Sequence, residues 1–488
     1  MLNAVSGRLA LAVLLVAGCA GSPETTAYPK LRPLGRDLVI PPELGLANTG
    51  GGTVDRPLGA SLPKVSTGMG EPTGHLTLQR ALAQTLVGSP ELSQFSYDVR
   101  SAEARALQAG YRPNPDIQLQ AEDFAGNRDQ AGFRNYQGTL TLSQLVELGG
   151  KRRGRVRLAH LETSLAGWNY ETQRLDVLTE TTRAFMNVLT AQRRVALADE
   201  GLRLEQQFYG AVSERTRAGD VSSLEERRAQ VARSNGQILI EQARRDLTAA
   251  RARLAASWGS KTPLFNQVEG DLGSGIKRPP DLPALLKLAE QNPDLARWET
   301  EIAQREAKLA VEQSRNVPDI TVNAGIRNYG PGRPSPDAPA VGGGYAFVGG
   351  IGLPLPISGM NQGNVLDARA QLEKSQVQRQ AAEIRVTAAI QQSFERISAA
   401  YETITALRRN VMPAAQTAYE GISTGYRQGK FSLLEVLDAR RALFDARNRL
   451  IDAEASYKIA LAETERLIGQ PLESIPVSSP VARPGEKP

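Results

Sequence analysis

The chain has 488 residues, with 58 lysine and arginine residues against 52 acidic ones and a formal net charge of +6. This length is enough for two or three ordinary domains or for one elongated structure. Only 5% of the residues are aromatic and the only strongly apolar run lies at the start of the chain, which excludes a helical membrane protein.

That apolar run lies in the segment RLALAVLLVAGC, residues 8–19. It is too short to span a bilayer, which takes about 20 residues, but it has the form of an export signal. Cys19, the only cysteine in the sequence, directly follows VAG, an arrangement that resembles a bacterial lipobox. We therefore expect a signal peptide over residues 1–18 and a lipid on Cys19. An ordinary signal peptide with a chance cysteine is the alternative.

The two ends of the chain have the composition of irregular segments. Residues 19–74 are rich in glycine, proline, serine and threonine, which predicts a tether without a core of its own. Residues 471–488 contain a proline every four or five residues and are predicted to be an irregular tail.

The body of the chain between these ends is a tandem duplication. Residues 89–117 match residues 292–320 at a constant offset of 203, and Gly154 matches Gly363 at an offset of 209. An insertion within residues 329–343 accounts for the difference. A constant offset that changes once at a loop predicts two structural copies. The expected repeats are residues 75–280 and 281–470.

Each copy contains two segments with the period-two alternation of a β-strand. The predicted strands are residues 116–123, 136–144, 320–327 and 345–356. Their length suits a tilted transmembrane strand of about 9–11 residues, although a soluble sheet with one wet face has the same pattern. Four strands cannot close a barrel, which needs about 8. In lipid, several chains would have to share one barrel, because open sheet edges cannot face lipid.

Each copy then continues into long helices. Residues 154–217 contain no proline and predict a helix of roughly 95 Å at about 1.5 Å per residue. Its counterpart, about 363–427, is interrupted only by Pro413, which should kink it. Shorter helices are expected at about 222–258 and 432–468.

In the second long helix, apolar residues repeat every 3.5 positions, with the charged Arg408 in one seam position. This period predicts left-handed coiled-coil packing. The seam residues are Ile390, Phe394, Ile397, Tyr401, Ile404, Val411, Ala415, Ala418 and Ile422.

A similar turn occurs twice, in RAGDVSSLEERRAQ (217–230) and RQGKFSLLEVLDARR (427–441). Gly219 and Gly429 are 210 residues apart, and so are Ser222 and Ser432. The glycines suit the left-handed position after a helix C-terminus. The serines suit the N-cap of the following helix.

Two acidic residues, Glu435 and Asp438, follow the second turn and lie one helical turn apart on one face. The equivalent residues of the first copy are Glu225 and Arg228. Most such acidic pairs are solvated surface residues, and that interpretation stays open here.

Other charged and nucleophilic residues form no recognisable site. The basic cluster of residues 149–157 could be a nucleic-acid patch, a collar near lipid phosphates or a solvated segment. His75, in the leader, and His160 lack the spacing of a metal site. No phosphate-binding glycine loop or nucleophile elbow is present. We predict that the chain is not an enzyme and holds no cofactor or metal.

Taken together, these motifs resemble the outer membrane efflux family, the TolC-like channels. The segment LSQLVELGGKRRGRVRLA (142–159), the NPDI motif and GLPLPISGMNQGNV (352–365) are similar to its heavy-metal cation branch, the CzcC/CusC-like channels. The resemblance implies a mainly α-helical fold with a small β part. It further implies a homotrimer in which a coiled-coil helical barrel crosses the periplasm and joins a shared 12-stranded transmembrane β-barrel in the outer membrane.

The resemblance also implies partners and sites. The chain would be the passive exit duct of a tripartite efflux system, working with a periplasmic adaptor and an inner-membrane pump of the resistance-nodulation-division type. Gly219, Ser222, Gly429 and Ser432 would lie on the helical tips that contact the adaptor. Glu435 and Asp438 match positions where the family places acidic rings at its entrance, although the family usually has aspartate at the first of them.

Three functions remain to be compared. The first is the exit duct with heavy-metal cations as cargo. The second is the same channel used for drugs or for protein secretion, because selectivity in such systems belongs mostly to the pump. The third is a periplasmic coiled-coil scaffold or adaptor, which would have no need for two equivalent membrane hairpins.

Overall fold

The computed structural model describes residues 70–126, 132–133, 135–289, 292–331, 342–357 and 359–472. The expectations for the signal peptide, for Cys19, for nearly all of the tether and for the tail lie outside these residues. The chain divides into two compact units. The described parts of the first unit are residues 104–159 and 310–362, and those of the second are residues 70–103, 160–309 and 363–472.

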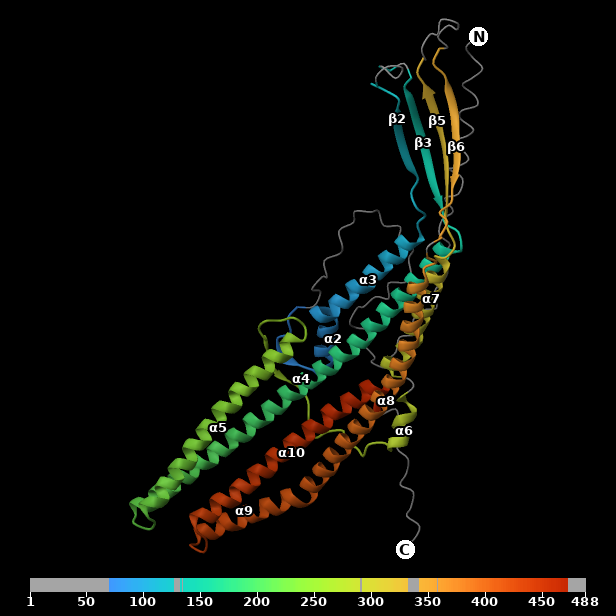
Figure 1. The fold of residues 1–488 in the computed structure, drawn as a ribbon. Coiled ribbons are helices and arrows are strands. Elements are labelled where there is room, and N and C mark those ends of the chain that lie inside the picture. The colour runs from blue at the N-terminus through green and yellow to red at the C-terminus, as the bar shows by residue number, and fades with distance from the viewer. Residues whose placement is uncertain are drawn as a thin grey trace, which may run out of the picture. The chain divides into compact units, whose positions relative to one another are not determined.

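Helices make up most of the described chain (Figure 1). The helices are α2 (Leu78–Gly88), α3 (Pro90–Gly110), α4 (Lys151–Arg217), α5 (Ser223–Ala256), α6 (Leu282–Lys287), α7 (Pro293–Ser314), α8 (Gln362–Ala406), α9 (Met412–Arg427) and α10 (Leu433–Ile468). The strands are β1 (Gly74–Leu76), β2 (Asp116–Glu122), β3 (Gln137–Val146), β4 (Phe265–Val268), β5 (Ile320–Tyr329) and β6 (Tyr345–Gly352). Strands β2, β3, β5 and β6 form a small sheet (Figure 1). Strands β1 and β4 form a second sheet.

The first unit contains a four-stranded antiparallel sheet in the order β2-β3-β5-β6. The register lines up apolar residues across all four strands. One row joins Leu119, Leu140, Ile326 and Phe347. Neighbouring residues along a strand point to opposite faces. The neighbouring row, on the other face, joins the polar residues Gln120, Thr139 and Arg327 to Ala346 of β6. The sheet therefore has one apolar and one mostly polar face.

The apolar face is exposed in the single chain. Ile117 is 76% exposed, Phe347 75% and Ile351 76%. On the polar face, the Arg327 guanidinium donates a 3.0 Å hydrogen bond to the Thr139 hydroxyl. All four predicted strands are present, but the last one ends at Gly352 and not at residue 356.

The second unit contains two helical hairpins, α4 with α5 and α9 with α10 (Figure 1). Helix α4 has 67 residues and starts three residues before its predicted start. Helices α5 and α10 have 34 and 36 residues. No described helix has the length and apolarity that crossing a bilayer would require.

The second long helix is interrupted before Pro413, as predicted. Residues Leu407–Val411 form a π-helical turn between α8 and α9, a feature that inserts an extra residue into the helical period. The seam prediction is correct through Ile404, which is 2% exposed, and again at Ile422, which packs against the core cluster at the turn between α9 and α10, but it is wrong directly after Ile404. Leu407 is buried instead of the next predicted position, and Val411 is 44% exposed. The heptad spacing is interrupted at the π turn, because the extra residue shifts the apolar face locally.

The largest apolar core of the second unit surrounds a two-stranded parallel sheet of β1 and β4. Phe265 of β4 is fully buried and its ring centroid lies 6.0 Å from that of Trp258. Phe185 of α4 packs in the same cluster. The sequence patterns did not reveal this sheet. His75, assigned to the leader from sequence, lies in β1 with its Nδ1 3.4 Å from Glu269.

Candidate functional site

The turn between α4 and α5 has a defined backbone pattern, because its glycine adopts a left-handed conformation. Gly219 has φ +85° and its N–H donates to the carbonyl of Thr216 at 3.1 Å. The N–H of Asp220 donates to the carbonyl of Arg215 at 2.9 Å. These two bonds form a Schellman motif, which satisfies carbonyls at the end of the helix.

The turn between α9 and α10 repeats this pattern. Gly429 has φ +75° and donates to the carbonyl of Tyr426 at 3.0 Å, and Lys430 donates to the carbonyl of Gly425 at 2.8 Å. Both glycines therefore have the predicted left-handed conformation. We call residues 215–225 the first tip and residues 425–435 the second tip, so that each tip includes the helix ends on both sides of its turn.

The two serines are both N-caps, but they cap in different ways. The Ser222 hydroxyl accepts a 3.2 Å hydrogen bond from the N–H of Leu224. The Ser432 hydroxyl accepts from the N–H of Glu435, whose carboxylate in turn accepts from the N–H of Ser432 at 2.7 Å. The second tip thus has a complete capping box, which satisfies two free donors at the helix start.

Glu435 and Asp438 are both exposed on the first turns of α10. The hydrogen bonds from the backbone and the hydroxyl of Ser432 lower the pKa of Glu435. Its carboxylate therefore stays charged at neutral pH even though it caps the helix. The two acids share a helix face as predicted, with Glu435 held by the cap.

A contact between the two tips involves a tyrosine that sequence reasoning missed. Tyr426, at the end of α9, is 7% exposed and its hydroxyl donates to the Glu225 carboxylate of α5 at 3.3 Å. Its ring centroid lies 5.5 Å from that of Phe208, and the Arg215 guanidinium lies over the ring at 5.3 Å. Burial, and then the nearby Glu225, raises the pKa of Tyr426, so the hydroxyl remains a donor at neutral pH.

One sequence signal could have found this contact. The residue equivalent to Tyr426 in the first copy, 210 positions earlier, is Thr216. The two copies therefore diverge next to a turn whose backbone they share. A change from a small polar to a large aromatic residue at equivalent positions indicates that the side chain has a role in one copy that it lacks in the other.

A series of ion pairs joins α4 to α10 above the tips. The residue numbers fall along α4 as they rise along α10, which shows that the two helices run antiparallel. The pairs are Arg440–Glu205 (2.7 Å), Arg447–Glu200 (2.6 Å), Arg194–Asp452 (2.6 Å), Arg183–Glu463 and Arg466–Asp176 (2.6 Å).

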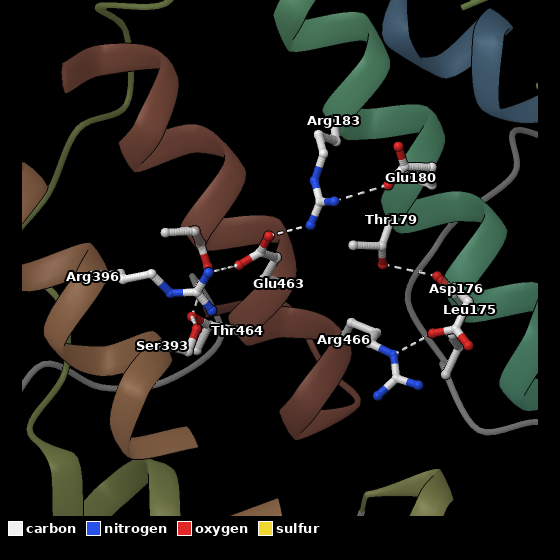
Figure 2. A network of polar contacts seen from close by, with 11 residues as sticks. Leu175, Asp176, Thr179, Glu180, Arg183, Ser393, Arg396, Glu463, Thr464 and Arg466 are labelled. Atoms are coloured by element: carbon white, nitrogen blue, oxygen red, sulfur yellow. Dashed lines mark hydrogen bonds and ion pairs between the residues drawn. The ribbon is translucent and has the colours of Figure 1, made fainter. Parts of the chain in front are cut away.

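Figure 2 shows the last two of these pairs, farthest from the tips. Glu463 of α10 forms ion pairs with Arg183 of α4 and with Arg396 of α8, the second at 2.8 Å. Beside it, the Ser393 and Thr464 hydroxyls lie 2.5 Å apart in a buried contact between α8 and α10. The Glu463 side chain is 15% exposed, so a largely buried carboxylate here is paired with arginines from two other helices.

The described residues do not assemble a metal centre. Within the described ranges, no three histidine, cysteine, aspartate or glutamate side chains lie together as metal ligands would. The arrangement at the tips is one of caps, a cross-hairpin contact and exposed carboxylates.

Comparison with known proteins identifies the class to which this fold belongs. The family model described as outer membrane efflux protein matches residues 81–260 and again residues 285–470. The chain therefore belongs to the outer membrane efflux protein family, and it functions as an efflux channel of the outer membrane.

Individual relatives are similar over most of their length. The cobalt-zinc-cadmium resistance protein CzcC of Cupriavidus metallidurans is 31% identical over 401 residues, which cover 82% of this chain and 91% of the relative. The cation efflux system protein CusC of Escherichia coli K12 is 25% identical over 398 residues, covering 78% and 83%. A crystal structure of CusC superposes with a TM-score of 0.68 at 19% identity, covering 86% of this chain and 99% of that one, and this likeness shows the fold.

Proposed function

We propose that this channel is the exit duct of a tripartite efflux system and that it passively conducts heavy-metal cations out of the periplasm. The relatives named for resistance to cobalt, zinc and cadmium and for cation efflux support the cargo. The main structural support for the exit duct is the sheet of β2, β3, β5 and β6, which has one apolar and one mostly polar face. One of its faces suits lipid and the other suits water.

The sheet also supports assembly with other copies of the chain. Strands β2 and β6 are its edges, and each leaves backbone groups unpaired in the single chain. In lipid such groups cost several kcal/mol each, so the edges must pair with neighbouring chains. Three chains with four strands each would close a 12-stranded barrel, with the helices forming the periplasmic tunnel.

The tips are proposed to be the periplasmic end of the duct. Gly219, Ser222, Gly429 and Ser432 would present two turns of the same backbone shape to a periplasmic adaptor, which couples the duct to a pump of the resistance-nodulation-division type. In a trimer, the two tips of each chain would form a ring of six. The Tyr426–Glu225 contact supports a gate at this ring, because it fastens one tip to the other.

Glu435 and Asp438 would form two acidic rings at the entrance. Three copies of each carboxylate around a narrow mouth would raise the local concentration of cations. The capping box supports this role for Glu435, because it fixes the position of the carboxylate and keeps it ionised. Asp438 is exposed one turn further along α10.

The remaining proposals concern the organisation of the chain. A signal peptide over residues 1–18 and a lipid on Cys19 would anchor the tether 19–74 in the outer membrane. The body would consist of two structural copies, residues 75–280 and 281–470, followed by the tail 471–488. Mass spectrometry of the mature N-terminus would test the lipid directly.

The cargo can be tested in cells that lack the chain but retain its pump and adaptor. We expect such cells to accumulate zinc, cobalt or cadmium, and expression of the wild-type chain to restore efflux. Expression of the Glu435→Gln/Asp438→Asn variant should restore less. The cation assignment would be overturned if expression restored drug resistance or protein secretion but left the metal content of the cells unchanged. The chain would then be a duct with another cargo.

A further inference from the structure

The basic cluster at the start of α4, in the first unit, divides into paired and unpaired residues. The ammonium group of Lys151 lies 2.7 Å from the Asp319 carboxylate. Arg155 is paired with Glu147, and its second nitrogen, Nη2, donates at 3.0 Å. Arg152, Arg153 and Arg157 are exposed and form no ion pair with any described residue. For brevity we call these three residues the arginine patch.

Two residues of the patch, Arg152 and Arg153, lie in the first turn of α4, where positive charge is unfavourable. The N-terminus of a helix carries a partial positive charge, so acidic residues stabilise it and basic ones destabilise it. The first turn of α4 contains no acidic residue, in contrast to Glu435 in the first turn of α10. Asp319 and Glu147 offset the charges of Lys151 and Arg155. Nothing among the described residues offsets the patch, and an external anion would.

The α4 start that contains the patch follows β3 at one end of the sheet, and other chain segments that adjoin the same end expose large apolar residues. Strands β2 and β5 begin at this end and β3 and β6 finish there, as the pairing of Asp116, Ser143, Asn323 and Gly350 shows. The chain segments that adjoin this end expose large side chains. They include Tyr111 (58%), Leu353 (49%), Leu355 (67%) and Ile357 (88%). Arginines next to an apolar surface are typical of the boundary between hydrocarbon and headgroups.

The opposite end of the sheet has a different character. Strand β2 finishes there at Glu122, followed by Asp123, and β6 begins there with Tyr345 in edge contact with Phe347. We call the end that adjoins the arginine patch the basic end of the sheet. Helices α4 and α8 begin at the basic end and α3 and α7 finish there, so a sheet that spans the outer membrane has this end on the periplasmic side, where the leaflet consists of phospholipid.

We propose that Arg152, Arg153 and Arg157 bind the phosphate groups of phospholipids in the periplasmic leaflet of the outer membrane. This inference rests on the proposed function, because it requires the sheet to lie in that membrane. The bound phosphates offset the charge at the start of α4, while Leu353, Leu355 and Ile357 contact the adjoining acyl region. The patch thereby fixes the depth of the sheet in the bilayer.

The test measures lipid binding to the purified full-length protein in an uncharged detergent. The two probes are dioleoyl phosphatidylglycerol and dioleoylglycerol, which share their acyl chains and differ in the phosphate-containing headgroup. Native mass spectrometry gives the bound lipid per chain over a lipid titration. The test variant is Arg152→Gln/Arg153→Gln/Arg157→Gln. The matched control is Arg253→Gln/Arg385→Gln/Arg409→Gln, which removes three exposed arginines from other helices.

We expect the wild type and the control to bind phosphatidylglycerol alike and the test variant to bind it about tenfold or more weakly. The variant with lysine at the three positions should bind within a few-fold of wild type, because it keeps the charge. If the glutamine variant does not fold, a salt titration of the wild type tests the proposal instead. Its phosphate-dependent lipid binding should weaken as ionic strength rises. Equal binding of both lipids, or an unchanged affinity in the glutamine variant, overturns the proposal.

Pore formation in planar bilayers separates this inference from the proposed function. A wild type that forms pores while the lipid result is negative leaves the duct in place and removes the arginine patch. A wild type that forms no pore removes the proposed function and the inference with it.

Discussion

The two tips have the same backbone and different side-chain chemistry. Each ends its first helix in a Schellman motif around a glycine and starts its second helix with a serine cap. Both copies also have a glutamate three residues after that serine, the spacing of a capping box. In the second tip, Glu435 closes the box. In the first tip, the Glu225 carboxylate instead accepts a hydrogen bond from the Tyr426 hydroxyl.

This difference shows how duplication can create a contact without changing a fold. The backbone pattern is set by glycine and serine, which remain in both copies. The glutamate of the first copy is available for another partner, because its helix keeps the simpler serine cap. The second copy supplies that partner by placing a tyrosine where the first has Thr216. One copy became the acceptor of the cross-tip contact and the other its donor.

The largest expected effect comes from removing the donor. Replacing Tyr426 with alanine leaves a cavity against Phe208 and removes the hydrogen bond to Glu225, which together should cost about 3 kcal/mol of local stability. Amide hydrogen exchange at both tips should accelerate, and single-channel conductance should rise. Thr216→Ala, the matched change in the first copy, should alter exchange little. Equal effects of the two substitutions would contradict the division of roles between the copies.

Alanine substitutions at the two glycines should have similar effects on stability, which tests whether the two tips share one backbone conformation. An added Cβ at Gly219 or Gly429 would meet no atom within 4 Å. The cost of alanine is therefore the left-handed backbone alone, about 1–2 kcal/mol at either position. Exchange rates measured at each tip should rise by similar factors. A cost confined to one tip would mean that the two turns do not share one conformation under the conditions of the measurement.

The serines should differ. Ser432→Ala removes one half of a reciprocal cap, and we expect a cost near the upper part of the range of about 0.5–2 kcal/mol for N-caps. Ser222→Ala removes a single bond and should fall in the lower part. Hydrogen exchange at the first turns of α10 and α5 measures both. A larger loss for Ser222 would show that the capping box adds nothing to the second tip.

The smallest effect is a pH dependence confined to the second tip. The folded-state pKa of Glu435 is lowered by the hydrogen bonds from Ser432. Its contribution is therefore fully present above the pKa of an unfolded glutamate, about 4.3, and is lost as the pH falls through the lower folded value. Protection at the start of α10 should decrease below about pH 4 in the wild type. The Glu435→Gln variant should show no such decrease, and a decrease of the same size in both would assign it to another group.

Much of the shared pattern could be predicted from the sequence, because local chemistry decides it. Glycine in the left-handed conformation and serine at the N-cap need only their neighbours, and the same holds for the alternation that marked the four strands. The cap partners could not be predicted in this way. The glutamate stands at the same spacing in both copies, yet only Glu435 closes a box, while Glu225 accepts a hydrogen bond from a tyrosine 201 residues away.

Two other features needed the three-dimensional structure. Strands β1 and β4 have three and four residues, too few for a period to show, and they are defined by their pairing and by the core around Phe265. The π turn at Leu407–Val411 shifts the apolar face of the second long helix, so the heptad pattern misplaced the seam at Arg408 and Val411. Pro413 indicated an interruption but not its geometry.

The most direct test of the account is the single-channel conductance of the purified full-length protein in planar bilayers, with its mass in solution measured in parallel. We predict trimeric, cation-selective pores whose preference for cations falls in the Glu435→Ala/Asp438→Ala variant. Pores with unchanged selectivity would keep the duct and make the two acids ordinary solvated residues. A soluble monomer that conducts nothing would contradict the exit duct and favour a periplasmic scaffold.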